Sequence, residues 1–163
     1  MRPIKFKVFE ENNIYSDKKC IKLDLDMEGL ENVFTTEIDG LEYELLTMLP
    51  ELVNHQCCTN EDSGLAHKLN RGIQLHHLCG HIALAVQDRA GINVGFCSQS
   101  RCCTSNCYTI YEYKYKNSGI EAGRIAVDVI NYFTGDDLFD LDFRLEILKE
   151  MFETEQSAVV TFI

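Results

Sequence analysis

Several features common to enzymes and membrane proteins are missing from this sequence of 163 residues. No apolar run approaches the roughly 20 residues that a membrane-spanning helix needs. The first residues, MRPIKFKVFEENN, lack the apolar centre of a secretory signal, so a cytoplasmic protein without a membrane partner is expected. The phosphate-binding loop, the dinucleotide fingerprint and the serine nucleophile elbow are also absent. Neither a nucleotide site nor a serine hydrolase therefore has support in this chain.

Positive charge is scarce. Fifteen Lys and Arg residues stand against 26 Asp and Glu residues, which gives a net charge of -11 at pH 7. Such a surface repels a phosphate backbone, so nucleic acid is a poor candidate partner, whereas a cationic ligand is plausible. The simpler explanation, favoured by the scattered positions of the acidic residues, is that the charge keeps the surface soluble.

Regularly spaced cysteine pairs are missing, although the sequence holds eight cysteines. In a secreted chain these would suggest disulfides, but cytosolic thiols normally stay reduced. The group Cys97, Cys102, Cys103 and Cys107 lacks the C-x-x-C pairs typical of structural zinc. Two interpretations stay open: free thiols in and around a hairpin, which is favoured, or a zinc site.

The residues that are present predict a single α+β domain. The length and the 45% hydrophobic content suffice for one sizeable core, and no internal repeat occurs. Residues 4–9 and 20–25 alternate apolar and polar side chains, as strands with one wet face do. Residues 92–98 and 107–115 resemble two more strands joined by a loop. We expect all four to form an antiparallel sheet.

Helices are expected to pack mainly on one face of this sheet. Their apolar stripes begin near residues 41, 74, 119 and 141. Pro50 either kinks or splits the first helix, and Ser118 can cap the third. The apolar tail SAVVTFI either packs as a strand or marks a chain cut from something longer.

The stretch from Gly72 to Gly91, GIQLHHLCGHIALAVQDRAG, carries the pattern most suggestive of chemistry. On an α-helix His77 and His81 project from one face and could together hold one metal ion, zinc above all. We expect this face to point away from the apolar stripe. In peptidases of the H-x-x-E-H type, a glutamate between the histidines activates the metal-bound water. Here that position is Gly80.

Two further histidines lie outside this helix. His55 opens the polar stretch HQCCTNEDSG, and His67 lies in a short helix that follows it. A lone histidine beside a loop is more often a solvated side chain than a ligand, so neither is expected to bind metal.

Along the expected strand 107–115, side chains alternate between two faces. Tyr111, Tyr113 and Tyr115 share one side, and Glu112 lies on the other. Glu112 is therefore a candidate third metal ligand if its face meets the histidines. The simpler alternative is a carboxylate paired with a lysine across strands.

The order of these landmarks resembles the N-terminal domain of the cyanophycin synthetases, which polymerise aspartate and arginine into a branched storage polypeptide. The similar residues extend over most of the chain: Asn13-Ile-Tyr15, Leu23-Asp-Leu25, Glu37-Ile-Asp-Gly40, Leu49-Pro-Glu-Leu-Val53, His55, Cys57, Arg71-Gly72, His77, His81-Ile-Ala-Leu84, Gln87, Ala90-Gly91, Val94-Gly-Phe96, Tyr111-Glu-Tyr113 and Ala122-Gly-Arg124. The resemblance implies a domain that holds the growing polymer near two ligase modules, one ATP-grasp and one Mur-ligase-like. Those modules, which would use ATP and magnesium, are absent from this chain.

In some members, the resemblance implies, a metallopeptidase-like site with the pattern G-H-I-x-E-H-x-A-L-E-L-Q clips polymer into primers. His77, His81 and Gln87 match its two histidines and its final glutamine. The departures that bear on the chemistry are Gly80 at the first glutamate, Ala85 at the second glutamate and His76 at the first glycine. Loss of a general base lowers a rate by a factor on the order of 100 to 10,000, so hydrolysis is expected to be very slow or absent.

Three functions are therefore open. The first is a binding module for an Asp-Arg polymer or an Arg-rich peptide, with Glu112 pairing with guanidinium groups and Tyr111 and Tyr113 stacking on them. For these tyrosines a buried strand face is the simpler role. The second is a metal-dependent peptidase that uses His77 and His81, with Glu112 as a third ligand. The third is a structural domain that docks the ligase modules, or a second copy of itself in a homo-oligomer.

Overall fold

The structure is a computed structural model that describes residues 1–57, 64–95, 98–103, 106–135 and 138–160. Its four strands form one antiparallel sheet in the order β1-β2-β4-β3. They are β1 (Arg2–Phe9), β2 (Cys20–Asp26), β3 (Ser98–Cys103) and β4 (Asn106–Glu112). The helices are α1 (Leu41–Met48), α2 (Leu65–Arg71), α3 (Leu75–Arg89), α4 (Lys116–Thr134) and α5 (Leu141–Val160), with short 3-10 helices at η1 (Thr35–Glu37) and η2 (Pro50–Asn54).

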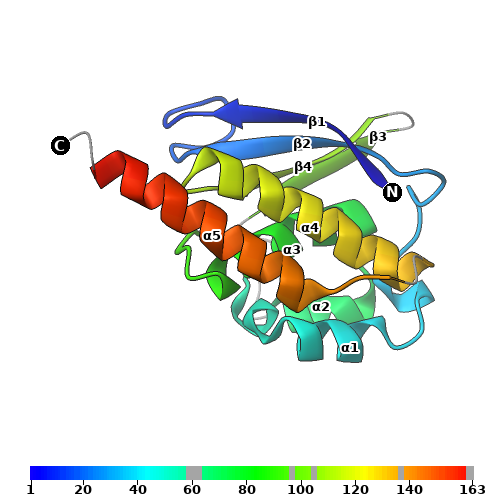
Figure 1. Cartoon of the computed structure of the whole chain (residues 1–163). Coiled ribbons are helices and arrows are strands. Elements are labelled where there is room, and N and C mark those ends of the chain that lie inside the picture. Colours follow the sequence, from blue (N-terminus) through cyan, green and yellow to red (C-terminus); the bar gives the residue numbers. More distant parts are fainter. Residues whose placement is uncertain (58–63, 96–97, 104–105, 136–137, 161–163) are drawn as a thin grey trace.

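The helices cover one face of the sheet, as Figure 1 shows. Helix α3 packs against β3 and β4, α4 packs against β1 and β2, and α5 lies on α4. Alternation explains this layering, because Ile21, Leu23 and Leu25 of β2 are buried on the helix side while Lys22 and Asp24 between them are only half-buried. The predicted α+β class with an antiparallel sheet is confirmed.

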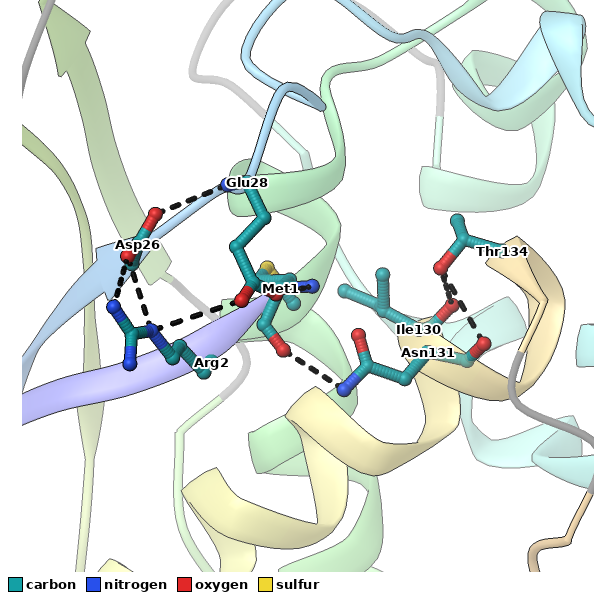
Figure 2. A network of polar contacts seen from close by, with 7 residues as sticks. All are labelled: Met1, Arg2, Asp26, Glu28, Ile130, Asn131 and Thr134. Atoms are coloured by element: carbon teal, nitrogen blue, oxygen red, sulfur yellow. Dashed lines mark hydrogen bonds and ion pairs between the residues drawn. The ribbon is translucent and has the colours of Figure 1, made fainter.

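Polar contacts tie the start of β1 to β2 and α4, as Figure 2 shows. The amino group of Met1 pairs with the Glu28 carboxylate at 2.9 Å, and the Arg2 guanidinium pairs with Asp26 at 2.8 Å. The Asn131 side-chain amide donates a hydrogen bond to the Met1 carbonyl at 2.8 Å. These contacts hold the outermost strand β1 against the helix layer.

The hairpin differs from its prediction. Residues 92–95 form no strand, and β3 instead begins at Ser98, the last residue of the expected strand, and continues through residues 99–103, which were expected to be a loop. Strand β4 ends at Glu112, so Tyr113 and Tyr115 lie beyond it. The sequence SQSRCC has no apolar alternation, so hydrogen-bonded pairing with β4 determines this edge strand more than its own composition does.

Three expectations for the helices are settled. Pro50 splits the first predicted helix, because α1 ends at Met48 and Pro50 opens η2. Ser118 does not cap α4, which begins at Lys116 and takes Ser118 into its first turn. The strand interpretation of the tail is wrong for residues 157–160, which end α5, and residues 161–163 lie outside the described residues.

Helix α3 is buried almost throughout. The expectation that its histidines lie on a face away from the core is wrong, since His81 is only 1% exposed. The reason is that α3 sits between the sheet on one side and α4 and η2 on others, so it has no broad solvent face. Among the described residues, no helix is both long and apolar enough to cross a membrane.

Candidate functional site

The first half of α3 brings its histidines next to a cysteine from a distant segment. Cys57 follows η2, and its sulfur lies 3.1 Å from Nε2 of His77. The rings of His77 and His81 face each other with centroids 5.1 Å apart, as their i, i+4 spacing requires. One ligand atom from each of Cys57, His77 and His81 lies within 4.8 Å of the other two. We call this group the Cys57 cluster.

Two neighbours fix the orientation of its imidazoles. The hydroxyl oxygen of Ser100 on β3 lies 2.9 Å from Nδ1 of His77, and Nδ1 of His55 lies 3.3 Å from Nδ1 of His81. Both outer contacts use Nδ1, which leaves Nε2 of each ring for the centre of the cluster. Among the described residues, Nε2 of His81 is buried and has no hydrogen-bond partner. A metal ion would satisfy that nitrogen.

Burial holds these imidazoles in the neutral form. It lowers the pKa of His81 to about 3, with further lowering from His77, His55 and Lys68. Burial also lowers the pKa of His55 to about 4, against an opposing effect of Glu51. The pKa of His77 is lowered by burial and then by Lys68. Near pH 7 the nitrogen lone pairs are therefore available, and a metal need not displace protons from these rings.

The donor set fits zinc. One thiolate and two imidazoles are ligands that zinc accepts in a tetrahedral arrangement, with a fourth position left for water. In zinc sites the second ring nitrogen of a histidine ligand typically contacts another polar group, as Nδ1 of His77 and of His81 do here. Among the described residues, the cluster contains no carboxylate, and Gly80, which is buried in α3 between the histidines, supplies none. The donor atoms could hold a metal, but the part of the chain that the structure describes places no general base beside them.

Glu112 is not brought to the histidines. Its carboxylate lies 3.4 Å from the Lys18 ammonium and accepts a hydrogen bond from the Gly95 N–H at 2.8 Å. The simpler expectation, pairing with a lysine, is what the structure shows, although the lysine comes from a loop. The Glu112 carbonyl accepts a hydrogen bond from the Gln87 side chain of α3 at 3.0 Å. Gln87 is six residues beyond His81, which places it about 9 Å farther along the helix. Glu112 therefore lies beside the other end of α3.

Glu112 instead lines an open pocket of about 600 Å³ between the loop before β2, residues 93–95 and the end of β4. Three carboxylates and three ammonium groups surround it together with Tyr113: Glu11, Asp17 and Glu112, and Lys18, Lys19 and Lys114. We call it the mixed-charge pocket. Two of the three residues predicted for polymer binding, Glu112 and Tyr113, therefore lie in one cavity.

Tyr111 lies elsewhere. Its ring is 1% exposed in the core, and its hydroxyl donates to the Gly119 carbonyl of α4 at 2.9 Å. This is the buried strand face that was the simpler expectation for the tyrosines, and it leaves no surface on Tyr111 for stacking with a ligand.

Sequence reasoning missed Cys57 and Ser100 and gave His55 the wrong environment. His55 was expected to be solvated, but it is 0% exposed and contacts His81, because η2, which it directly follows, packs against α3. His67 is exposed, as expected. Both His55 and Cys57 are among the residues that carry the family resemblance, and this was the sequence signal that could have pointed to them.

The cysteine group near the hairpin is only partly described, since Cys97 lies outside the described residues. Cys103 is an exposed free thiol. Cys102 and Cys107 lie directly opposite each other on β3 and β4 and are joined by a disulfide, so the favoured interpretation as free thiols does not hold for this pair.

Most of the chain is similar to one family of known proteins. The family model described as "Cyanophycin synthase-like N-terminal domain" matches residues 21–134. The cyanophycin synthetase of Geminocystis herdmanii is 30% identical over 154 residues, which cover 93% of this chain and 18% of that protein. The cyanophycin synthetase of a Synechocystis species is 33% identical over 138 residues, covering 82% of this chain and 16% of that protein. The chain thus spans less than a fifth of the length of these relatives.

Proposed function

The chain belongs to the cyanophycin synthase-like N-terminal domain family, and from this premise we propose that it is the polymer-holding module of a cyanophycin synthetase-like ligase. In this proposal it retains an Asp-Arg polymer in the cytoplasm. The ATP-grasp and Mur-ligase-like modules, in the rest of a longer protein or in another chain, carry out the ATP- and magnesium-dependent joining of amino acids.

The observation that carries the proposal is the lining of the mixed-charge pocket. A polymer of aspartate and arginine presents carboxylates and guanidinium groups at short intervals. The pocket offers both complements, with Glu11, Asp17 and Glu112 for guanidinium groups and lysines for carboxylates. Charge-assisted hydrogen bonds of this kind are about twice as strong as neutral ones. A uniformly acidic pocket would favour any cation, whereas alternating signs favour a polymer that alternates as well.

Titration calorimetry with a soluble Asp-Arg oligomer tests the proposal. Binding should weaken as salt rises, because the contacts are ionic and open to solvent. The variant Glu112→Gln should weaken binding about tenfold, since the amide can still accept from the Gly95 N–H but carries no charge. Glu146→Gln, at an exposed position on α5, is the matched control and should bind like the parent chain.

Two results would overturn it. One is the absence of binding even at low salt. The other is equal affinity for the Glu112→Gln and Glu146→Gln variants, which would place any polymer contact away from the pocket. Lys114→Gln tests the positive side of the pocket. It removes an ammonium group that would pair with carboxylates of the oligomer, so it should also weaken binding.

A second and narrower proposal concerns the Cys57 cluster. Its observation is the convergence of one sulfur and two imidazole nitrogens, which lie within 4.8 Å of one another. We propose that Cys57, His77 and His81 hold zinc, which lowers the pKa of a bound water. Ser100 and His55 orient the two rings. Because Gly80 supplies no base, a polymer-clipping peptidase, the alternative function, would be very slow in this chain.

Metal analysis of protein purified without chelators tests this second proposal. Cys57→Ser should lower the zinc content by about one equivalent per chain relative to the parent, and His67→Ala, which alters an exposed histidine, should not. Unchanged zinc in Cys57→Ser would refute the site. The zinc-loaded parent should release no soluble peptide from Asp-Arg polymer above the rate in buffer, and brisk release would instead support the peptidase.

A further inference from the structure

A second group of metal-ligating side chains lies beside the Cys57 cluster and has no part in the functions above. A ring nitrogen of His76 and the sulfurs of Cys102 and Cys107 all lie within 4.8 Å of one another. His76 comes from the first turn of α3, and the cysteines face each other across β3 and β4. The side chains of α3, β3 and β4 thus bring three possible metal ligands together.

His76 has a buried ring nitrogen without a hydrogen-bond partner among the described residues. This nitrogen is Nδ1, and the side chain as a whole is 2% exposed. A buried polar nitrogen left unpaired costs roughly 1–3 kcal/mol.

The group is separate from the Cys57 cluster. His76 and His77 are consecutive on α3, so their side chains point about 100° apart around the helix. His77 is turned toward Cys57 and Ser100, whereas His76 is turned toward the end of the hairpin. The position of His76 is glycine in the pattern G-H-I-x-E-H-x-A-L-E-L-Q that this helix resembles, so His76 is not one of the residues of that pattern.

A cavity gives access to the group. It has a volume of about 670 Å³ and is lined by Glu31, Asn32, Gln74, Cys102 and Cys103. Cys107 is buried at 3% exposure, and Cys102 is half-buried at the cavity wall. An ion can therefore enter beside Cys102, and a water or a polar group of the cavity can complete four-coordination.

We propose that His76, Cys102 and Cys107 form a second site for a thiophilic divalent ion of the zinc class. The disulfide and the metal-bound dithiolate are then two states of one cysteine pair, and a thiol or phosphine reductant supplies the two electrons that open the disulfide before the metal binds. Metal binding to the reduced pair forms two metal–sulfur bonds and releases two protons, one from each thiol. Tetrahedral zinc needs ligand atoms about 3.5–3.8 Å apart. The two sulfurs of the reduced pair would reach this separation by rotation of their side chains.

Cobalt(II) titration of the whole chain tests the proposal. The protein is first reduced with a phosphine, which takes up the oxygen of water and leaves two thiols, and is then moved to oxygen-free buffer. If both clusters bind, the chain takes up two cobalt ions, and thiolate-to-cobalt charge-transfer absorption grows with each. Cys102→Ser should remove one ion and most of that absorption, because two of the three thiolate ligands belong to this site.

The controls separate this proposal from the one for the Cys57 cluster. Cys103→Ser changes an exposed cysteine on the same strand and should leave two ions bound. Cys57→Ser should remove the other ion and leave the absorption of the Cys102–Cys107 site. The second site is refuted if Cys102→Ser and Cys107→Ser bind as much cobalt as Cys103→Ser, whatever Cys57→Ser does.

Zinc protection of cysteines against alkylation, measured on the unaltered chain, tests the site even if a cysteine variant fails to fold. Zinc at about 100 times its dissociation constant should slow alkylation of Cys102 and Cys107 on the order of a hundredfold, while exposed Cys103 reacts at an unchanged rate. Peptide mass spectrometry reports each cysteine separately. Equal alkylation of Cys102 and Cys107 with and without zinc refutes the site, even where Cys57 is protected.

Discussion

At the scale of single residues, Tyr111 sets how closely α4 approaches the sheet. Its hydroxyl bonds to the Gly119 carbonyl, and a Cβ added at Gly123 would overlap that hydroxyl and lie 2.8 Å from Cε1 of Phe6. Tyr111 itself is fully buried. Glycine at position 123 therefore makes room for an aromatic side chain that crosses from β4 to α4.

The variant Gly123→Ala should accordingly be destabilised. Overpacking of this kind typically costs about 1–3 kcal/mol, and the better helix propensity of alanine offsets up to about 1 kcal/mol. We expect a net loss of about 1–2 kcal/mol in the free energy of unfolding, measured by urea denaturation. Gly64→Ala is a suitable control, since its added Cβ meets only ordinary contacts at 3.5 Å. Equal stability of the two variants would contradict this account.

Three buried histidines make the stability of the metal-free chain depend on pH. Burial lowers the pKa values of His55 and His76 to about 4 and of His81 to about 3, against about 6.5 in the unfolded chain. Between these values the unfolded chain binds more protons than the folded chain. Stability from these groups is therefore fully present above pH 6.5 and is lost as the pH falls toward 4.

We predict a fall in the free energy of unfolding, on the order of a few kcal/mol, as the pH drops from 7 to 4.5 in the presence of a chelator. Urea titrations at several pH values measure it. The His67→Gln variant lacks only an exposed histidine and should follow the same curve. A flat curve above pH 4.5, where most carboxylates stay ionised, would show that the buried histidines are not held neutral.

At the scale of elements, α5 is attached to α4 by charge at both ends. Near its end, the Glu155 carboxylate accepts hydrogen bonds from the N–H groups of Asn117 and Ser118 at 2.7 and 2.9 Å. Near its beginning, Arg144 pairs with Glu121 and Asp128 of α4. The first turn of α4 is thus capped by a side chain from another helix, which the local sequence, with Ser118 as its candidate, could not indicate.

Removing that cap should loosen the pair of helices. Glu155→Ala leaves two N–H groups at the start of α4 without their acceptor and removes a negative charge from the positive end of the helix dipole. We expect a loss of about 1–2 kcal/mol, and earlier amide exchange at Asn117 and Ser118 than elsewhere in α4. Glu153→Ala, at an exposed position two residues earlier, should change neither quantity.

Sequence alone predicts elements whose own residues carry the signal. Strand β2 has a clear alternation and α3 a histidine pair at helical spacing, and both are where expected. Strand β3 has no such signal, because its residues are small and polar and it forms by pairing with β4. Cys57 likewise meets His77 only through the turn after η2, twenty residues away along the chain. Contacts between residues far apart in the sequence produce no periodic pattern in it.

At the scale of the whole molecule, α3 connects two separate chemical regions. The Cys57 cluster lies at its first half, against β3, while Gln87 near its other end holds the last residue of β4, beside the mixed-charge pocket. The burial of α3 beneath the sheet in Figure 1 keeps the two apart. The proposed metal site and the proposed polymer site therefore lie in different parts of the domain.

This separation predicts that the two functions are energetically independent. Sites more than about 7–10 Å apart with no shared partner usually add within about 0.5 kcal/mol. Glu112→Gln should weaken Asp-Arg oligomer binding and leave the metal content unchanged, and Cys57→Ser should do the reverse. Calorimetry and metal analysis on both variants and on their combination complete the cycle. If Cys57→Ser weakened oligomer binding as much as Glu112→Gln does, the polymer would have to pass over the histidines, as a peptidase requires and a holding module does not.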